Sequence, residues 1–391
     1  MSINGSLLRI RLTKATLNMA SNYQLMNIFP HSWTEEDKLS FPTISKPISH
    51  GGFSLSPNGQ FERNSHRMHY IVVPPIQHFP LSLRDNDTTR NQHKMPELLL
   101  DNMLQFIESS RFSFLKAMNM RVVVDAHVVC TSEVLELIMC APYEHKSGWS
   151  LGVTRYRNTM YICRMDSVQP NAFDQDHLKQ VMEESWLMTL RKHCLKESGT
   201  GALNNKRSLG GRFHGVFSFD LNGNRILFDS PVLAEPNPNE GGSNPNWAEL
   251  QMRLVHMSRQ DWAIHNRTEA LKWWVKCFLL GIESLYIAHR DEHAFVHNIQ
   301  KTSARDLWKS CDQFWSTHVC ANFLLRFLAY ISQVMAPIDC PSTVYLFEFD
   351  AKQGILAYKP YPGRNQFTFV ADWYRMMLDE HAEDICTPVQ R

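Results

Sequence analysis

The chain has 391 residues, of which 43% are hydrophobic and 20% charged, a composition that is ordinary for a globular protein and excludes wholesale disorder. This length exceeds the size at which one hydrophobic core usually stops growing, so we expect one large domain or two closely packed ones. Lysine and arginine number 40 against 39 aspartate and glutamate, a formal net charge of +1, which excludes nucleic-acid binding by bulk charge and restricts any such contact to a local groove.

The apolar segments and the cysteines exclude further classes of protein. The longest apolar stretch, Val319 to Ile338, is interrupted by Asn322, Arg326 and Gln333, so we expect no membrane span. The opening residues lack an apolar h-region, so we expect no signal peptide. The nine cysteines include no Cys-x-x-Cys pair, which argues against a disulfide framework or a zinc module and favours a reducing compartment.

The N-terminal quarter of the chain is predicted to be irregular. Residues 1–18 contain three basic residues, and no acidic residue precedes Glu35. That pattern is superficially like a mitochondrial presequence, but we favour a disordered extension because termini are commonly unstructured. Residues 19–95, rich in Pro, Ser, Asn and His, predict an extended arm and loops wrapped on the folded domain of residues 96–391.

The middle of the chain predicts alternating helices and strands. Apolar residues recur at helical spacing over Pro96–Met118, and Asp174–Lys196 also reads as a long helix. A β-branched strand, Arg121–Val129, precedes a short helix with Thr131 or Ser132 as N-cap. Turn residues between apolar runs predict two hairpins, Gly148–Arg155 with Thr159–Arg164, and Arg212–Asp220 with Arg225–Leu233 across Asn222-Gly223.

The C-terminal part predicts more elements of both kinds. We expect helices around Leu271–Phe278, closed near Gly281, around Leu324–Ile331 and near Trp373, with strands at Trp247–Leu254, Ser284–Ala288, Thr343–Phe349 and Ile355–Tyr361. The Gly- and Ser-rich segment Ser198–Gly211 and the polar segment Glu235–Asn246 predict loops. Hairpins outnumber β-α repeats, so we predict a mixed α/β fold with substantial antiparallel sheet in a single globular unit.

Most generic chemical motifs are missing. The glycines of Ser198–Gly211 lack the spacing of a phosphate-binding loop, and no G-x-S-x-G elbow is present. His289, His293 and His297 are spaced four apart and would share one face of a helix, as zinc ligands do. Because His289 follows a predicted strand, we favour scattered surface histidines instead.

One basic cluster and two aromatic pairs leave alternatives open. Six basic residues against one acidic residue lie between Arg191 and Phe213, and this cluster fits a phosphate-binding groove or a solvated helix end equally well. The pairs Trp273-Trp274 and Trp373-Tyr374 could stack on bases, but on amphipathic helices such residues are more often core.

Several short segments, kept in order along the chain, resemble the DXO family of decapping exoribonucleases. The most specific is Leu271-Lys272-Trp273-Trp274, followed by Phe278-Leu279 and Gly281. The others are Gly52-Phe53-Ser54-Leu55, Leu81-Ser82-Leu83-Arg84, Ala141-Pro142-Tyr143-Glu144 with Gly148-Trp149, Ile226-Leu227-Phe228, Val319-Cys320-Ala321-Asn322-Phe323 and Asp372-Trp373-Tyr374. The resemblance implies a restriction-nuclease-like core with largely antiparallel and mixed sheets flanked by helices. It also implies paired Mg²⁺ or Mn²⁺ ions held by carboxylates, which activate water and stabilise the leaving group.

The family's residues on the helices are substituted here. On the long helix, Thr189 stands at the position of a glycine and His193 at that of a glutamate. Lys276 stands where the Trp-Trp helix of the family carries glutamine. Ser132 stands where a basic residue precedes the Ala-Pro-Tyr segment in active members.

The family's residues on the strands are largely lost as well. Its Glu-hydrophobic-Asp strand corresponds to Pro231-Val232-Leu233, and its Glu-hydrophobic-Lys strand survives only as Glu249-Leu250-Gln251. One carboxylate is a poor site for two divalent cations, so we predict no catalytic site, no metal site and no cofactor, with the charge of the pocket inverted. Asp229 or Glu235 remains open as a substitute ligand.

This pattern of losses is similar to a catalytically degenerate insect germline member of the family. That resemblance implies a nuclear protein acting with Rhino and Deadlock in piRNA-precursor transcription and transposon silencing. We therefore predict a pseudoenzyme that shields RNA with an uncapped 5′ end, with Arg191, Lys192, His193 and Lys276 as phosphate contacts. A protein-interaction scaffold without RNA binding and an active metal-dependent decapping or 5′–3′ exoribonuclease stay open as alternatives.

Overall fold

The computed structural model describes residues 24–26, 28–35, 40–84, 100–119, 121–165, 175–197, 211–236 and 245–379, and the statements below concern these ranges. The predicted N-terminal extension 1–18 and nearly all of the loop Ser198–Gly211 lie outside them. So does the greater part of the loop Glu235–Asn246.

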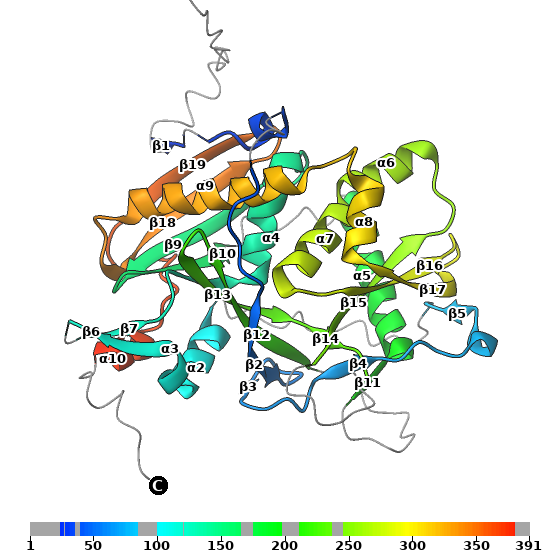
Figure 1. Ribbon diagram of the computed structural model, residues 1–391, viewed down its shortest axis with the longest axis horizontal. Coiled ribbons are helices and arrows are strands. Elements are labelled where there is room, and N and C mark those ends of the chain that lie inside the picture. The colour runs from blue at the N-terminus through cyan, green and yellow to red at the C-terminus, as the bar shows by residue number, and fades with distance from the viewer. Residues whose placement is uncertain are drawn as a thin grey trace, which may run out of the picture.

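A large twisted sheet forms the left half of the molecule in Figure 1. Strand β8 runs parallel to both of its neighbours, β10 and β13, and the remaining pairs in this sheet are antiparallel. In spatial order the strands are β1 (Gln24–Leu25), β19 (Ile355–Tyr361), β18 (Cys340–Asp350), β9 (Trp149–Tyr156), β10 (Thr159–Met165), β8 (Val128–Thr131), β13 (Asn224–Pro231), β12 (Arg212–Leu221), β2 (Ile48–Leu55) and β3 (Phe61–Glu62).

Turn chemistry explains the two hairpins of this sheet. Between β12 and β13, Asn222 and Gly223 both have positive φ, at 48° and 83°. Between β9 and β10, Arg157 and Asn158 do the same, at 50° and 67°. Two central residues of positive φ give a turn whose twist matches that of the flanking strands. Both hairpins predicted from the sequence are therefore confirmed.

A second, smaller sheet lies to the right in Figure 1. Its central pair, β15 and β16, is parallel, so the chain crosses between them through helices α6 (Arg259–Arg267) and α7 (Glu269–Leu280). In spatial order the strands are β11 (Leu195–Glu197), β4 (His69–Ile71), β14 (Leu233–Ala234), β15 (Trp247–Leu254), β16 (Ser284–Arg290), β17 (Phe295–Ser303) and β5 (Leu81–Ser82). A separate ribbon pairs β6 (Leu115–Met118) with β7 (Arg121–Val124).

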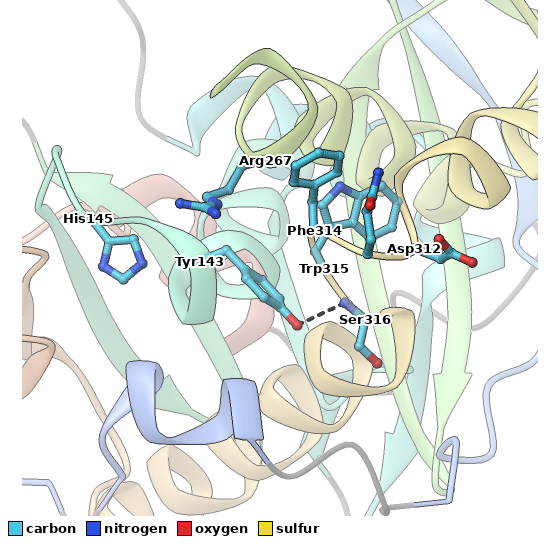
Figure 2. Close-up of a pocket in the computed structure, with 8 residues that line it drawn as sticks. Tyr143, His145, Arg267, Asp312, Phe314, Trp315 and Ser316 are labelled. Carbon is cyan, nitrogen blue, oxygen red and sulfur yellow. Dashed lines mark hydrogen bonds between the residues drawn. The ribbon is translucent and has the colours of Figure 1, made fainter. Parts of the chain in front are cut away.

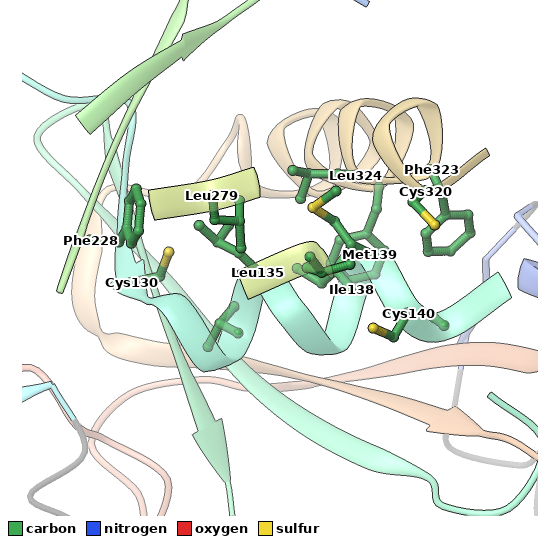
Figure 3. Close-up of a cluster of buried hydrophobic side chains, with 14 of the residues drawn as sticks. Cys130, Leu135, Ile138, Met139, Cys140, Phe228, Leu279, Cys320, Phe323 and Leu324 are labelled. Carbon is green, nitrogen blue, oxygen red and sulfur yellow. The ribbon is translucent and has the colours of Figure 1, made fainter. Parts of the chain in front are cut away.

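Helices α4 (Ser132–Cys140) and α7 (Glu269–Leu280) pack on each other between the two sheets, and α9 (Thr317–Met335) packs against α4 over the large sheet. Figure 3 shows Leu135 and Met139 of α4 meeting Leu279 of α7 and Phe323 and Leu324 of α9. Helix α7 ends at Gly281, whose φ of 65° closes it as predicted.

Other helices cover the outer faces. Helices α2 (Asp101–Ser109) and α10 (Asp372–Asp379) bury apolar side chains against the far side of the large sheet, and α5 (Gln175–Cys194) does so against the smaller sheet. The remaining helices are α3 (Arg111–Phe114), α6 (Arg259–Arg267), α8 (Ala304–Cys311) and the 3₁₀ turns η2 (Pro30–Glu35), η3 (Ile76–His78) and η4 (Ala141–Tyr143).

The observed elements differ from the predicted ones where tertiary pairing overrides local pattern. The helix predicted over Pro96–Met118 gives way at Leu115 to a strand, because Leu115–Met118 pairs with β7. The predicted strand Arg121–Val129 breaks at Asp125, whose carboxylate accepts hydrogen bonds from Lys116 and Arg225. Within the predicted arm, β2 is an eight-residue strand paired with β12.

Among the described residues, no helix is long and apolar enough to cross a membrane.

Candidate functional site

Two of the positions predicted from the family resemblance, Glu249 and Lys276, meet between the sheets. Glu249 and Gln251 alternate with Leu250 along β15, so both project from the same face of that strand. Lys276 is the eighth residue of α7, and α7 packs on β15 from that face. The chain topology therefore brings together residues that are distant in the sequence.

The contacts of Glu249 leave neither of its oxygens open. Lys276 Nζ lies 2.7 Å from Oε2, and Gln251 Nε2 donates a 2.9 Å hydrogen bond to Oε1. The Glu249 side chain is 1% exposed and that of Lys276 17% exposed. A carboxylate this deeply buried is stable only when it is paired and hydrogen-bonded. The pair carries no net charge, so Lys276 neutralises Glu249, and an inverted sign of the wider pocket stays a prediction.

Sequence reasoning missed a second carboxyl group at this place. Glu136, on α4, interacts electrostatically with both Lys276 and Glu249. Burial raises the pKa of Glu136 to about 7, although the Lys276 charge and a hydrogen bond with Ser132 act in the opposite direction. Ser132 in turn donates a 2.9 Å hydrogen bond to Ser230 Oγ on β13. The only feature of the sequence that points to Glu136 is its four-residue spacing from Ser132 on a predicted helix, which places both side chains on one face.

The lost strand carboxylates leave an irregular strand end. Strand β13 ends at Pro231, and Leu233 belongs to a separate strand, β14, in the other sheet. The predicted strand Arg225–Leu233 is therefore interrupted at Val232, as expected where proline removes a backbone donor. The side chain of Leu233 packs against the apolar cluster beneath α5.

These residues do not fit the paired divalent cations that the family resemblance implies. Pro231 and Leu233 offer no side-chain oxygen, and hard cations bind almost entirely through oxygen. The ammonium group of Lys276 already lies beside Glu249 Oε2, the position that a cation would need.

The two substitute carboxylates are also engaged. Asp229 Oδ2 lies 2.6 Å from His214 Nδ1, and both side chains are buried. Glu235 accepts a 2.6 Å hydrogen bond from Tyr286 Oη and lies 2.5 Å from Lys301 Nζ. Burial would raise the pKa of Glu235, but the hydrogen bonds from Lys301 and Tyr286 outweigh it and lower that pKa.

The predicted contacts on α5 lie along the end of that helix. Thr189 is buried, and its hydroxyl donates to Ser185 O at 3.2 Å. His193 is exposed, with Nε2 3.2 Å from Ser82 O, and Lys192 is exposed beside it. Arg191 is half-buried, and its Nε has no hydrogen-bond partner in the described part of the chain. Phosphate binding by these residues stays a prediction. Of the wider basic cluster, Lys206 and Arg207 lie outside the described residues.

The histidines spaced four apart and the two aromatic pairs lie on elements of different kinds. His289 lies on β16 and His297 on β17, so the helical face that a zinc site requires does not form. No group of three or more potential metal-binding side chains occurs in the described ranges. Trp273 and Trp274 are buried in the core, whereas Trp373 is 38% exposed next to the fully buried Tyr374.

Comparison with known proteins identifies what this arrangement is similar to. Residues 45–375 match the family described as RAI1 like PD-(D/E)XK nuclease. Protein cutoff of Drosophila melanogaster is 62% identical over 372 residues, covering 94% of this chain and 97% of that protein. The human decapping and exoribonuclease protein is 24% identical over 329 residues, covering 79% and 80% of the two chains. The crystal structure of Candida albicans Rai1 in complex with pU5–Mn²⁺ shares the fold, with a TM-score of 0.64 at 12% identity over 91% of this chain and 99% of that one.

Proposed function

This chain belongs to the RAI1-like PD-(D/E)XK nuclease family, and from that membership we propose that it keeps the nuclease fold without the hydrolytic chemistry. In this proposal the protein binds RNA with an uncapped 5′ end and shields that end from decay. The observation that carries it is the buried ion pair between Lys276 and Glu249.

The loss of catalysis is inferred from charge and ligand type. Two-metal hydrolysis requires several carboxylate oxygens to hold the cations and to activate water. Here Glu249 is neutralised by Lys276 and hydrogen-bonded by Gln251. A cation entering this place would have to displace an ammonium group and would find Leu233 where the family has a carboxylate.

RNA-end binding is inferred from the groups around the altered site. Candida albicans Rai1 has been solved with the 5′-phosphorylated RNA pU5. In this chain, Arg191, Lys192 and His193 form a basic last turn of α5, and such groups bind phosphate oxygens through charge-assisted hydrogen bonds. The ammonium of Lys276 has three donors, so it can contact a phosphate while it remains paired with Glu249.

The cellular role follows the similarity to protein cutoff. Identity of 62% over nearly the whole of both chains supports a shared role. We propose that the protein acts in the nucleus, in a complex with Rhino and Deadlock that promotes piRNA-precursor transcription and transposon silencing.

The test measures binding and cleavage in the same samples. Fluorescent RNAs with a 5′-monophosphate or a 5′-hydroxyl are titrated with the full chain, with and without Mn²⁺, and the products are separated on a gel. We expect tighter binding of the phosphorylated end and intact RNA. The Lys192→Glu/His193→Glu variant should lose this selectivity, whereas Lys309→Glu, an exposed lysine on α8, should keep it.

Two results would overturn the proposal. Mn²⁺-dependent degradation that disappears in Glu249→Ala would show an active nuclease with rearranged ligands. Intact RNA with no end selectivity would favour a protein-interaction scaffold.

A further inference from the structure

A cleft of about 310 Å³ opens at the other end of α4 from Ser132 (Figure 2). Three chain segments form it: the turn η4 with His145 after it, the last residue of α6, Arg267, and the linker of residues 312–316 between α8 and α9. A volume of this order is at the lower end of the range for small-ligand sites.

The walls of the cleft are held in place by buried contacts. Ser316 N donates a 2.8 Å hydrogen bond to Tyr143 Oη, drawn as the dashed line in Figure 2. Trp315 Nε1 donates to Asn266 O at 2.9 Å, and the indole is only 2% exposed. The site is therefore preformed, which reduces the conformational entropy that a ligand must offset.

One side of the cleft is basic. In Figure 2 the guanidinium of Arg267 extends toward the imidazole of His145 above Tyr143. His31 packs against His145 with ring centroids 4.1 Å apart and the ring planes tilted by 50°, and its Nε2 lies 2.7 Å from Glu144 O. Burial and the charges of His31 and Arg267 lower the pKa of His145. His145 is therefore mainly a neutral N–H donor at pH 7, and Arg267 supplies the positive charge of this side of the cleft.

The nearby carboxylates do not neutralise Arg267. Among the described residues, none lies within ion-pair distance of its guanidinium. Glu144 accepts hydrogen bonds from the backbone of Lys146 and Ser147. Asp312 lines the opposite end of the cleft, and in Figure 2 its carboxylate points away from Arg267. The guanidinium, with five donors and no acceptor, is left open to an anion.

An aromatic ring lines the same cleft as these donors. Phe314 is half-buried in the cleft wall and packs its inner edge against the main core. An arginine and an aromatic ring that line one cleft can contact a phosphate and a neighbouring base of a single strand, respectively.

We propose that this cleft binds a phosphate group of an RNA strand, with Arg267 and His145 contacting the phosphate oxygens and Phe314 contacting the adjoining base. The choice of RNA rests on the proposed function above, but the site is separate from the Lys276–Glu249 pair. Arg267 precedes α7, and Lys276 lies roughly 10 Å along that helix from its start. The cleft would hold an internal phosphodiester, so it adds affinity without distinguishing 5′ ends.

The experiment compares three variants of the full chain by fluorescence anisotropy with a 12-nucleotide RNA bearing a 5′-hydroxyl. We expect Arg267→Ala to weaken binding about five- to tenfold and to lower the salt dependence by about 0.7 in log–log slope. Phe314→Leu, which keeps the apolar volume, should weaken binding by a smaller factor. Arg305→Ala removes an exposed arginine on α8 and should leave affinity within about twofold of the wild type.

The ratio of affinities for 5′-phosphorylated and 5′-hydroxyl RNA should be the same in Arg267→Ala as in the wild type. If the wild type binds 5′-phosphorylated and 5′-hydroxyl RNA with equal affinity, end binding is wrong and the cleft proposal still stands. Equal RNA affinity of Arg267→Ala and wild type would overturn the cleft and leave end binding standing.

A second arm identifies the source of the phosphate. Adenosine 5′-monophosphate and adenosine are titrated by calorimetry against the wild type and Arg267→Ala. Arg267-dependent binding of the monophosphate supports the site and extends it to free nucleotides, whereas Arg267-dependent binding of RNA alone restricts it to strands. If RNA does not bind in an Arg267-dependent way, the proposal is wrong, whether or not the monophosphate binds.

Discussion

Replacing Lys276 by methionine isolates the charge of the ammonium group, because methionine retains most of the apolar stem. The substitution leaves Glu249 without its ion-pair partner at a side-chain exposure of 1%, with only the Gln251 hydrogen bond remaining. Breaking a buried pair from one side typically costs about 3–5 kcal/mol of folding free energy. The alternative for the protein is to protonate the carboxyl, which for a glutamate of ordinary acidity costs about 3.7 kcal/mol at pH 7.

Both routes give a similar loss, so we expect Lys276→Met to lower the free energy of unfolding by about 4 kcal/mol at pH 7. At the usual unfolding entropy per residue, a chain of 391 residues converts this into a fall in Tm of about 5 °C. Protonation becomes easier as the pH falls, so the loss should shrink to about 1 kcal/mol at pH 5.

The assay is urea unfolding followed by circular dichroism at pH 7 and pH 5. Lys272→Met is the matched control, because Lys272 lies on the same helix in an exposed pair with Glu269, about half exposed on each side. Such a pair is worth less than about 1 kcal/mol. The double variant Lys276→Met/Glu249→Gln should recover part of the loss. Equal effects of the two lysine substitutions at pH 7, or a loss independent of pH, would refute the reasoning.

Three further outcomes follow from buried groups and tight backbone contacts. The pKa of Glu136 is raised to about 7 in the folded state. Its contribution to stability is therefore fully present below about pH 4.5 and is lost as the pH rises through 7. We expect Glu136→Gln to flatten the pH dependence of the unfolding free energy across that window. Asp229→Asn should destabilise by about 3 kcal/mol through the buried contact with His214, whereas Glu133→Gln, in an exposed pair with Arg164, should change stability by less than about 1 kcal/mol in the same urea titration. Gly52→Ala should lower the Tm far more than Gly223→Ala. A Cβ at residue 52 would lie 2.1 Å from His214 O, whereas a Cβ at residue 223 meets open space. Gly223→Ala should therefore cost only about 1 kcal/mol of backbone strain.

The sequence by itself determined the local elements and the family. Asn222-Gly223 and Arg157-Asn158 mark their hairpins because each turn needs two successive residues of positive φ. Gly281 ends α7 because glycine adopts a positive φ without steric cost. The resemblance carried by the Leu271–Gly281 segment and the others is confirmed by the match over residues 45–375, and with it the mixed α/β fold. These signals are short segments of neighbouring residues, so they can be recognised in the sequence without knowing which residues make contact.

Tertiary structure alone decided the chemistry of the altered site. Glu249 and Lys276 are far apart in the chain, and only the packing of α7 on β15 joins them in an ion pair. Glu136 had only its four-residue spacing from Ser132 as a signal, and the Asp229–His214 contact had none. Strand β2 forms because β12 offers it a partner. A carboxylate's partners and acidity depend on which groups burial brings within a few ångströms, and that information resides in the fold and not in the spacing of residues along the chain.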